Sequence, residues 1–355
     1  MLLAFALLLQ DPDPKRVDAA VADGVNYLKR LKEQKGDPKT DELVLLTFIV
    51  AGVPPDDPTF AAILGRVLAA PLQETYKVSL QAMALEKLDP RKHQLRLFEC
   101  AQFLADTQCR NGQWSYGGAF VPVQGLTAAG RRPAAKLVVV PRGQGGAAGD
   151  HSNSQYAALG IRACHDAGMV FPKAFIERAR QAWIDGQQKA DPKRVATGGA
   201  PPRGWGYKLH HADATGSMTA GGVGAVAIYD LMLGIDWKRD PSALSGLAWL
   251  AAHFTVAANP ERADGDWHHY YLYGLERAGS LFGTEKIGAH AWYRDGAKQL
   301  LDSQHAAGSW RDERNDGNGW GESLRDTCFA ILFLRRATKP LVDVASVDRF
   351  RAPKK

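Results

Sequence analysis

The chain has 355 residues, of which 45% are hydrophobic and 23% are charged, a composition that excludes a disordered or a largely membrane-spanning protein. The formal net charge of +6 is concentrated in two segments, since residues 115–149 carry +4 and residues 335–355 carry +5, which leaves −3 on the remainder. No stripe of Lys and Arg follows a predicted helix, so we expect no nucleic-acid partner.

The N-terminal segment 1–14 reads MLLAFALLLQDPDP, an apolar run of about eight residues that is too short to span a bilayer. A secretory signal also needs a basic start and a small-residue cleavage site, and both are poorly developed here. Two interpretations stay open, a short export signal or a buried N-terminal segment. We expect export to the periplasm or the medium, with a cytoplasmic location as the alternative.

From residue 15 onward, apolar residues with a period of 3.6 predict helices almost throughout and no convincing strand. The helices come in six pairs. The first members are amphipathic and cover about 15–34, 57–70, 91–108, 172–188, 240–257 and 288–304; the second, far more apolar, begin at Thr40, Glu74, Asn153, Gly216, Trp267 and Ser323.

A helix that is apolar on most of its circumference must be buried, whereas one with a single apolar stripe can face solvent. Their alternation predicts an all-α (α/α)6 toroid, with six inner and six outer helices over residues 15–338, followed by a basic tail at 339–355. The glycines of the inner helices, such as Gly221 and Gly222, are expected to allow a neighbouring helix to approach closely.

Two long connections rich in Gly, Pro and Ala, residues 115–149 and 189–215, interrupt otherwise short joins between helices. Such lengths are uncommon inside a compact domain and are typical of functional or disordered loops. A role at the rim of a cavity and plain disordered decoration are both open. The four cysteines lack metal-type spacing, and we expect small buried thiols.

Two stretches, Gln108–Trp114 and Gln304–Trp310, share the pattern Q-x-x-x-G-x-W and mark an internal repeat. Each follows a predicted helix, so the Gln lies in its last turn and the Gly at its exit, where a positive φ is usually needed. The Trp can then return to cover the helix end.

These stretches resemble the QW repeats of the terpenoid cyclase and protein prenyltransferase α/α-toroid superfamily, in particular bacterial squalene-hopene cyclase-like proteins with prenyltransferase and squalene oxidase repeats. Arg203–Tyr207 (RGWGY) resembles a third repeat whose Gln is Gln187, and the resemblance spans residues 15–338. It implies a toroid with a central cavity for an apolar ligand, with isoprenoids as the candidate class. The D-x-D-D acid of class II cyclases is missing, so we expect no squalene cyclisation.

Asp326-Thr327-Cys328 has the local D-x-C spacing with which protein prenyltransferases bind zinc, and His268 or His269 opens the preceding inner helix. In that family the His follows the D-x-C pair, so the order is reversed here. The alternative is that Asp326 is a favourable charge near a helix N-terminus and Cys328 a core residue. We therefore predict neither a metal nor a cofactor.

Polar residues gather before or at the start of three inner helices: the run Asp266–Tyr271, then His210, His211 and Asp213, and then Asp150, His151 and Asn153. At corresponding positions of three repeats they would converge on one end of the cavity, although helix caps alone would account for several of them. The candidate catalytic residues are His268, His269, Tyr270, Asp326, Asp150 and Asp213. An Asp would act as the acid, and the aromatic residues would form a cation-stabilising wall.

Three functions stay open: a cavity protein for an apolar small molecule, a carbohydrate-processing lyase or hydrolase, and a non-catalytic interaction scaffold. An isoprenoid site predicts a deep pocket of Trp, Tyr, Phe and Leu with one isolated carboxylate. A sugar site predicts an open cleft with several Arg, Asn and paired acids, and a scaffold predicts a plugged ring. Contact with a membrane surface is not indicated, and whether the protein is an enzyme is left open.

Overall fold

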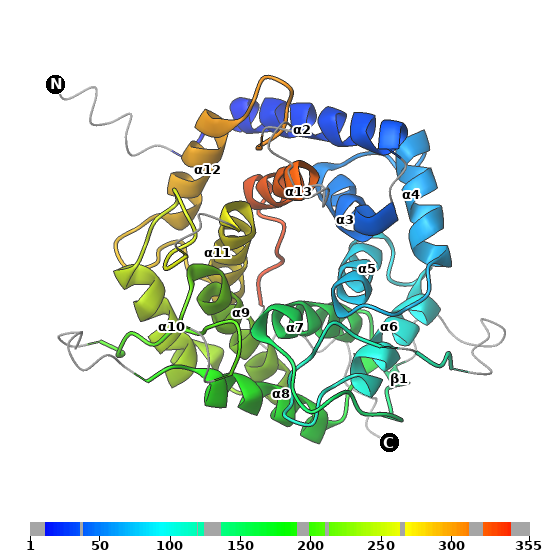
Figure 1. Ribbon diagram of the computed structural model, residues 1–355, viewed down its shortest axis with the longest axis vertical. Helices are drawn as coiled ribbons and strands as arrows, with labels where there is room; N and C mark the ends of the chain where they lie inside the picture. Colours follow the sequence, from blue (N-terminus) through cyan, green and yellow to red (C-terminus); the bar gives the residue numbers. More distant parts are fainter. Residues whose placement is uncertain are drawn as a thin grey trace, which may run out of the picture.

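A computed structural model describes residues 11–35, 38–118, 120–123, 136–189, 199–209, 213–262, 267–311 and 322–341. Within these ranges the chain forms twelve α-helices in two concentric rings (Figure 1). The outer helices are α2 (Pro14–Lys35), α4 (Pro58–Ala69), α6 (Gln94–Asp106), α8 (Lys173–Gly186), α10 (Pro241–Ala252) and α12 (Trp292–Ser303). The inner helices are α3 (Asp41–Ala51), α5 (Thr75–Leu88), α7 (His151–Asp166), α9 (Gly216–Leu233), α11 (His268–Phe282) and α13 (Glu322–Leu334).

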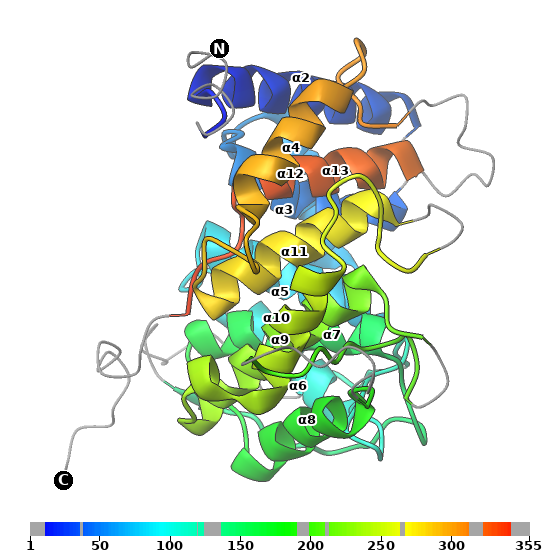
Figure 2. The ribbon, with the colours of Figure 1, turned by 90° about the vertical axis from the view of Figure 1, so that its left-hand side faces the viewer.

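The inner ring is closed. Each inner helix packs against the next one along the chain, and α13 packs back against α3. The predicted all-α (α/α)6 toroid is therefore confirmed, with the outer and inner members in the predicted order. Figure 2 shows the same helices from the side, with α2, α12 and α13 at one edge of the ring and α6 and α8 at the opposite edge.

Burial separates the two rings as the sequence pattern requires. Every residue from Gly216 to Asp230 of α9 is buried, whereas in α4 the buried residues are Phe60, Ile63 and Val67, a single stripe with helical spacing. In α4 the side chain of Asp57 accepts hydrogen bonds from two backbone amides and Pro58 occupies the first turn, both favourable starts for a helix. Among the described residues, α9 is the single helix long and apolar enough to cross a membrane, and 83% of it is buried inside the ring.

The glycines of α9 make room for side chains rather than for a neighbouring helix backbone. A Cβ on Gly222 would lie 2.5 Å from the indole of Trp205, and a Cβ on Gly221 would lie 2.6 Å from the amide oxygen of Gln155. Gly246 of α10 faces the same indole, at 2.7 Å. The ring of Trp205 is thus held between an inner and an outer helix, so the expected close helix approach is wrong for Gly221 and Gly222. It holds for Gly160 of α7, where an added Cβ would lie 2.9 Å from the Cα of Ser79 on α5.

Three Gln–Trp pairs connect neighbouring outer helices with the same hydrogen bonds. In each pair the indole N–H of the Trp donates to the backbone carbonyl four residues before the Gln, at 2.7–2.9 Å. The side-chain amide of the Gln donates to two backbone carbonyls. One belongs to the residue two positions before the Trp, and the other belongs to the neighbouring outer helix. The pairs are Gln108–Trp114, Gln187–Trp205 and Gln304–Trp310, and their partners in the next outer helix are Phe175, Ser242 and Ala20. The last pair joins α12 to α2, so it closes the outer ring.

Short elements complete the fold. Two 3-10 turns, Pro38–Thr40 and Trp237–Arg239, precede α3 and α10. The two-residue strands β1 (Leu137–Val138) and β2 (Met169–Val170) pair in parallel, with Leu137 opposite Met169, so the sequence-based expectation of no strand needs this small correction. The described part of the 115–149 connection packs on α6, where the side chain of Gln102 donates to the Val140 carbonyl at 2.7 Å.

Candidate functional site

Polar side chains from four inner helices meet at the end of the ring where these helices begin. The hydroxyl of Tyr76 on α5 donates to Ser152 Oγ on α7 at 2.5 Å, and Ser152 Oγ lies 2.9 Å from the hydroxyl of Tyr270 on α11. On the neighbouring side, His269 Nδ1 of α11 lies 3.3 Å from Asp326 Oδ2 of α13. We call these five residues the mouth cluster. The fold thus brings two predicted residues into contact, His269 at the start of α11 and Asp326 of α13.

The direction of the hydrogen bonds beneath the mouth cluster is fixed by Arg277 of α11. Its Nη2 donates to Gln155 Oε1 at 2.8 Å, so the amide nitrogen of Gln155 points the other way and donates to the Tyr270 hydroxyl at 2.6 Å. Ser152 accepts from Tyr76, and either hydroxyl can donate in the contact between Ser152 and Tyr270. Whichever of the two donates, the proton of the other is left to donate to another group.

The tyrosines of the mouth cluster are donors rather than bases. Burial raises the pKa of Tyr270 and of Tyr76 well above the usual value for a phenol. Both hydroxyls therefore keep their protons at neutral pH. The arrangement suits the binding of a polar group that accepts hydrogen bonds.

Asp326 is held as a carboxylate. Burial would raise its pKa, but the hydrogen bond to His269 and the charges of His269 and Arg311 outweigh burial and lower the pKa below its usual value. Arg311 Nε donates to Asp326 Oδ2 at 2.8 Å and its Nη1 binds Glu322. A lowered pKa is the opposite of what a general acid needs, so the geometry favours Asp326 as a fixed negative charge.

Asp150 lies at the start of α7 and caps that helix. Its carboxylate accepts from the backbone N–H of Asn153 at 2.7 Å and from the side-chain amide of the same residue at 2.8 Å. Burial raises the pKa of Asp150, whereas the hydrogen bonds from Asn153 and Tyr207 oppose the shift. Among the described carboxylates that were predicted as catalytic, Asp150 is thus the one with a raised pKa, which is the direction that a general acid requires.

The other predicted residues lie around this end of the ring. His268 Nε2 lies 2.8 Å from the Val256 carbonyl, and burial lowers the pKa of this imidazole. Asp213 is exposed on the approach to α9 and does not join the mouth cluster. His151, from the same run as Asp150, stacks on Trp183 with ring centroids 4.5 Å apart. His210, His211 and Asp266 lie outside the described residues.

The D-x-C motif does not form a metal-binding arrangement. Asp326 and Cys328 are two positions apart on α13 and so point in very different directions. Cys328 is fully buried with its thiol hydrogen-bonded to Thr47, and burial raises its pKa to about 12. In the part of the chain that the structure describes, no group of three or more His, Cys, Asp and Glu side chains could hold a metal ion.

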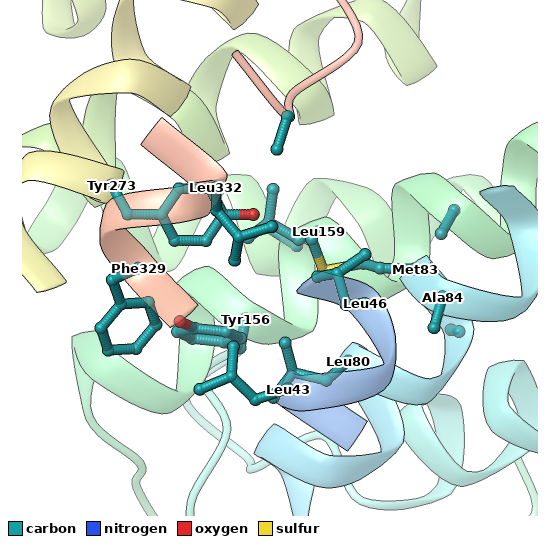
Figure 3. Close-up of a cluster of buried hydrophobic side chains, with 14 of the residues drawn as sticks. Leu43, Leu46, Leu80, Met83, Ala84, Tyr156, Leu159, Tyr273, Phe329 and Leu332 are labelled. Atoms are coloured by element: carbon teal, nitrogen blue, oxygen red, sulfur yellow. The ribbon is translucent and has the colours of Figure 1, made fainter. Parts of the chain in front are cut away.

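Along its axis the ring is lined by apolar and tyrosine side chains from the inner helices. Figure 3 shows Leu43, Leu46, Leu80, Met83, Ala84, Tyr156, Leu159, Tyr273, Phe329 and Leu332 converging there. In the middle of their helices, Leu80, Met83 and Leu159 keep 7–8% of their surface accessible, whereas residues facing the outer ring, such as Ala158, have none. Other residues of the same lining are almost completely inaccessible, such as Leu46 and Leu332 at 0% and Tyr273 at 1%, so the side chains pack closely along the axis.

The segment that follows α13 crosses the opposite end of the ring (Figure 1). The backbone N–H and the hydroxyl of Thr338 donate to the carboxylate of Glu276 near the end of α11, at 3.1 and 2.6 Å. Lys339 Nζ lies 3.8 Å from Glu86 Oε1 of α5. The chain thus covers part of the end opposite the mouth cluster.

A small hollow of about 190 Å³ lies away from the axis, and Leu72, Gln73, Arg96, Glu99 and Phe120 line it together with two prolines. Pockets that hold drug-sized ligands usually measure about 300–1,000 Å³. We therefore place the candidate site at the mouth cluster and the axis rather than in this hollow.

Sequence reasoning missed five residues of the site, namely Tyr76, Ser152, Gln155, Arg277 and Arg311. The spacing of residues in α11 could have indicated one of them, Arg277. Tyr270, Tyr273 and Arg277 are spaced as i, i+3 and i+7, which puts an arginine on the same face of α11 as two tyrosines. The partner of that face, on α7, could not be read from the spacing.

Fold and site together define an all-helical toroid with an apolar axis and a polar end. No protein-family profile matches the chain, and the comparison with curated proteins gives no match. Among solved structures the chain is similar to the type II terpene cyclase MstE from Scytonema in its apo form, with 12% sequence identity and a TM-score of 0.31 over 92% of this chain and 99% of that one. The toroid assignment rests on the two closed rings of helices in this chain.

Proposed function

We propose that the toroid binds one slender apolar molecule along its axis, with the polar end of the ligand at or below the mouth cluster. The observation that carries this proposal is the convergence of apolar and aromatic side chains of the inner helices on the axis (Figure 3), next to the hydrogen-bonded hydroxyls of the mouth cluster. Isoprenoid chains are the candidate class, because the lining combines Leu and Met with the rings of Tyr156, Tyr273 and Phe329.

The other two functions gain less support from the same residues. A carbohydrate-processing site needs a carboxylic acid beside a second carboxylate, but Asp326 and Glu322 share Arg311 and the pKa of Asp326 is lowered. A pure scaffold predicts a ring plugged by inner-helix side chains, and it would be favoured if no apolar ligand bound. The assignment of His268, His269, Tyr270, Asp326, Asp150 and Asp213 as catalytic residues stays a prediction, and so does export.

The proposal is tested by blocking the axis. Leu159→Trp adds an indole at the centre of the ring, whereas Ile235→Trp adds the same group beyond the end of α9, where Ile235 is 41% exposed. Delipidated wild-type protein is titrated with N-phenyl-1-naphthylamine, an apolar dye, and the dye is displaced with farnesol. We expect one saturable site per chain, at least a tenfold loss of affinity in Leu159→Trp, and wild-type affinity in Ile235→Trp.

Two results would contradict the proposal. One is the absence of saturable binding to the wild-type protein. The other is equal affinity in wild type and Leu159→Trp once circular dichroism shows that both variants have the wild-type helix content.

A further inference from the structure

Inner helix α11 carries an arginine inside the ring. Arg277 is 2% exposed, and among the described residues its side-chain hydrogen bond goes to the amide of Gln155 rather than to a carboxylate. Its Nη2 donates to Gln155, but its Nη1 is buried without a hydrogen-bond partner among the described residues. A guanidinium is a planar fork that can bind two oxygens at once, and here Tyr156 and Tyr273 interact with the guanidinium while Nη1 keeps no hydrogen-bond partner.

The surroundings of Arg277 compensate only part of the cost of burying a charge. The guanidinium carbon lies 4.3 Å from the ring centroid of Tyr273 and 5.2 Å from that of Tyr156. Both rings also line the axis (Figure 3), so the arginine lies directly beside the proposed ligand path. Cation–π contacts are attractive, but a buried cation without a counter-ion remains costly and attracts an anion.

The nearest acid along the chain does not supply that anion. Glu276 precedes Arg277, and successive helical residues point about 100° apart. The Glu276 carboxylate accepts hydrogen bonds from Ser280 and Thr338, and burial raises its pKa although these bonds and the charge of Arg277 oppose the shift. Its charge is therefore weakened, and its oxygens are used by other groups.

We propose that Arg277 binds the carboxylate of the axial ligand, so that the ligand class is an apolar monocarboxylic acid. This inference rests on the proposed function, because it assigns the polar end of the same ligand. One buried cation balances one negative charge. A diphosphate ester would bring two or three negative charges into an apolar interior that offers a single unpaired cation, so the charge balance favours the carboxylate.

The test uses three ligands with one carbon chain: farnesoic acid, farnesol and farnesyl diphosphate. Their affinities for the full-length protein are measured at pH 8 by displacement of the apolar dye. We expect the acid to bind wild-type protein at least about tenfold more tightly than the alcohol, because a charge-assisted hydrogen bond replaces a neutral one. Arg277→Met is expected to bind acid and alcohol equally.

Two further variants isolate the role of the fork. Arg277→Lys keeps the charge without the fork and should retain part of the preference for the acid. Arg162→Met removes another largely buried inner-ring arginine, one already paired with Asp166 at 2.9 Å, and should keep the full preference.

The outcomes separate the two proposals. Equal binding of acid and alcohol to wild type, tighter binding of the diphosphate than of the acid, or a preference that survives in Arg277→Met would overturn the role of Arg277 and leave the apolar site intact. Absence of binding by all three ligands would overturn both proposals.

Discussion

Replacement of Gly308 by alanine tests how closely the last outer helix approaches the first. Gly308 belongs to the Gln304–Trp310 pair, has a φ of +93°, and a Cβ added there would lie 2.4 Å from the carbonyl oxygen of Asp23 on α2. Real Cβ atoms essentially never come within 3.0 Å of such an atom. The substitution therefore combines a left-handed backbone with a clash against the backbone of a neighbouring helix.

The two costs can be separated with a matched glycine. Gly52 has a φ of +79°, but no atom lies within 4 Å of an added Cβ, so Gly52→Ala reports the backbone cost alone, about 1–2 kcal/mol. Gly308→Ala adds the clash, which requires a movement of at least about 0.6 Å, and overpacking of this kind costs about 1–3 kcal/mol. We expect a total loss of about 2–5 kcal/mol for Gly308→Ala.

The assay is urea unfolding followed by circular dichroism at 222 nm, with wild type, Gly52→Ala and Gly308→Ala side by side. Gly112→Ala repeats the test in another pair, because Gly112 has a φ of +85° and its added Cβ would lie 2.3 Å from the Arg178 carbonyl oxygen. If both motif variants lose no more stability than Gly52→Ala, the outer helices do not approach as described.

Two further predictions concern charges. Asp326→Asn should lower the free energy of unfolding by about 1–2 kcal/mol at pH 7. Because the folded pKa of Asp326 is depressed, this contribution is fully present above the unfolded pKa and is lost as pH falls through the folded pKa. The difference in unfolding free energy between variant and wild type should therefore begin to shrink as pH falls below the ordinary Asp value of 3.8, and a difference that does not shrink in acid would contradict this. Arg180→Met should lower the free energy of unfolding by about 3–5 kcal/mol at pH 8. The reason is that Arg180 binds two buried carboxylates, that of Asp230 at 2.5 Å and that of Asp240. Burial already raises the pKa of Asp230 to about 6 despite Arg180, so the loss should shrink at pH 5 as that carboxylate takes up a proton, and a loss that does not change with pH would argue against this origin.

The ring architecture could be predicted because each helix carries its own burial pattern. The contrast between the stripe of α4 and the fully buried α9 is visible in the sequence alone. The third Gln–Trp pair was harder to find, since Gln187 and Trp205 are separated by an insertion, but the residue types identified it and its hydrogen bonds repeat those of the other two pairs.

The site was predicted only in part because its contacts join residues far apart in the chain. The start of α11 was singled out by its run of His and Tyr, whereas Ser152 and Tyr270 are 118 positions apart, and Gln155 and Arg277 are 122 apart. Nothing in either segment indicates that the other faces it. The buried arginine looks like an ordinary surface residue until α7 is placed against α11.

The hydrogen bond from Gln304 to the Ala20 carbonyl has a consequence for how this protein can fold and evolve. It joins residues 284 positions apart, so the last helix pair completes a structure whose first pair formed at the other end of the chain. An open helical array can gain or lose a repeat and needs polar terminal repeats to protect its ends. A closed ring has no ends to protect, but removing one pair would leave a gap that no neighbour can fill. The number of pairs is therefore fixed by geometry, and length can vary freely only in the connections between helices.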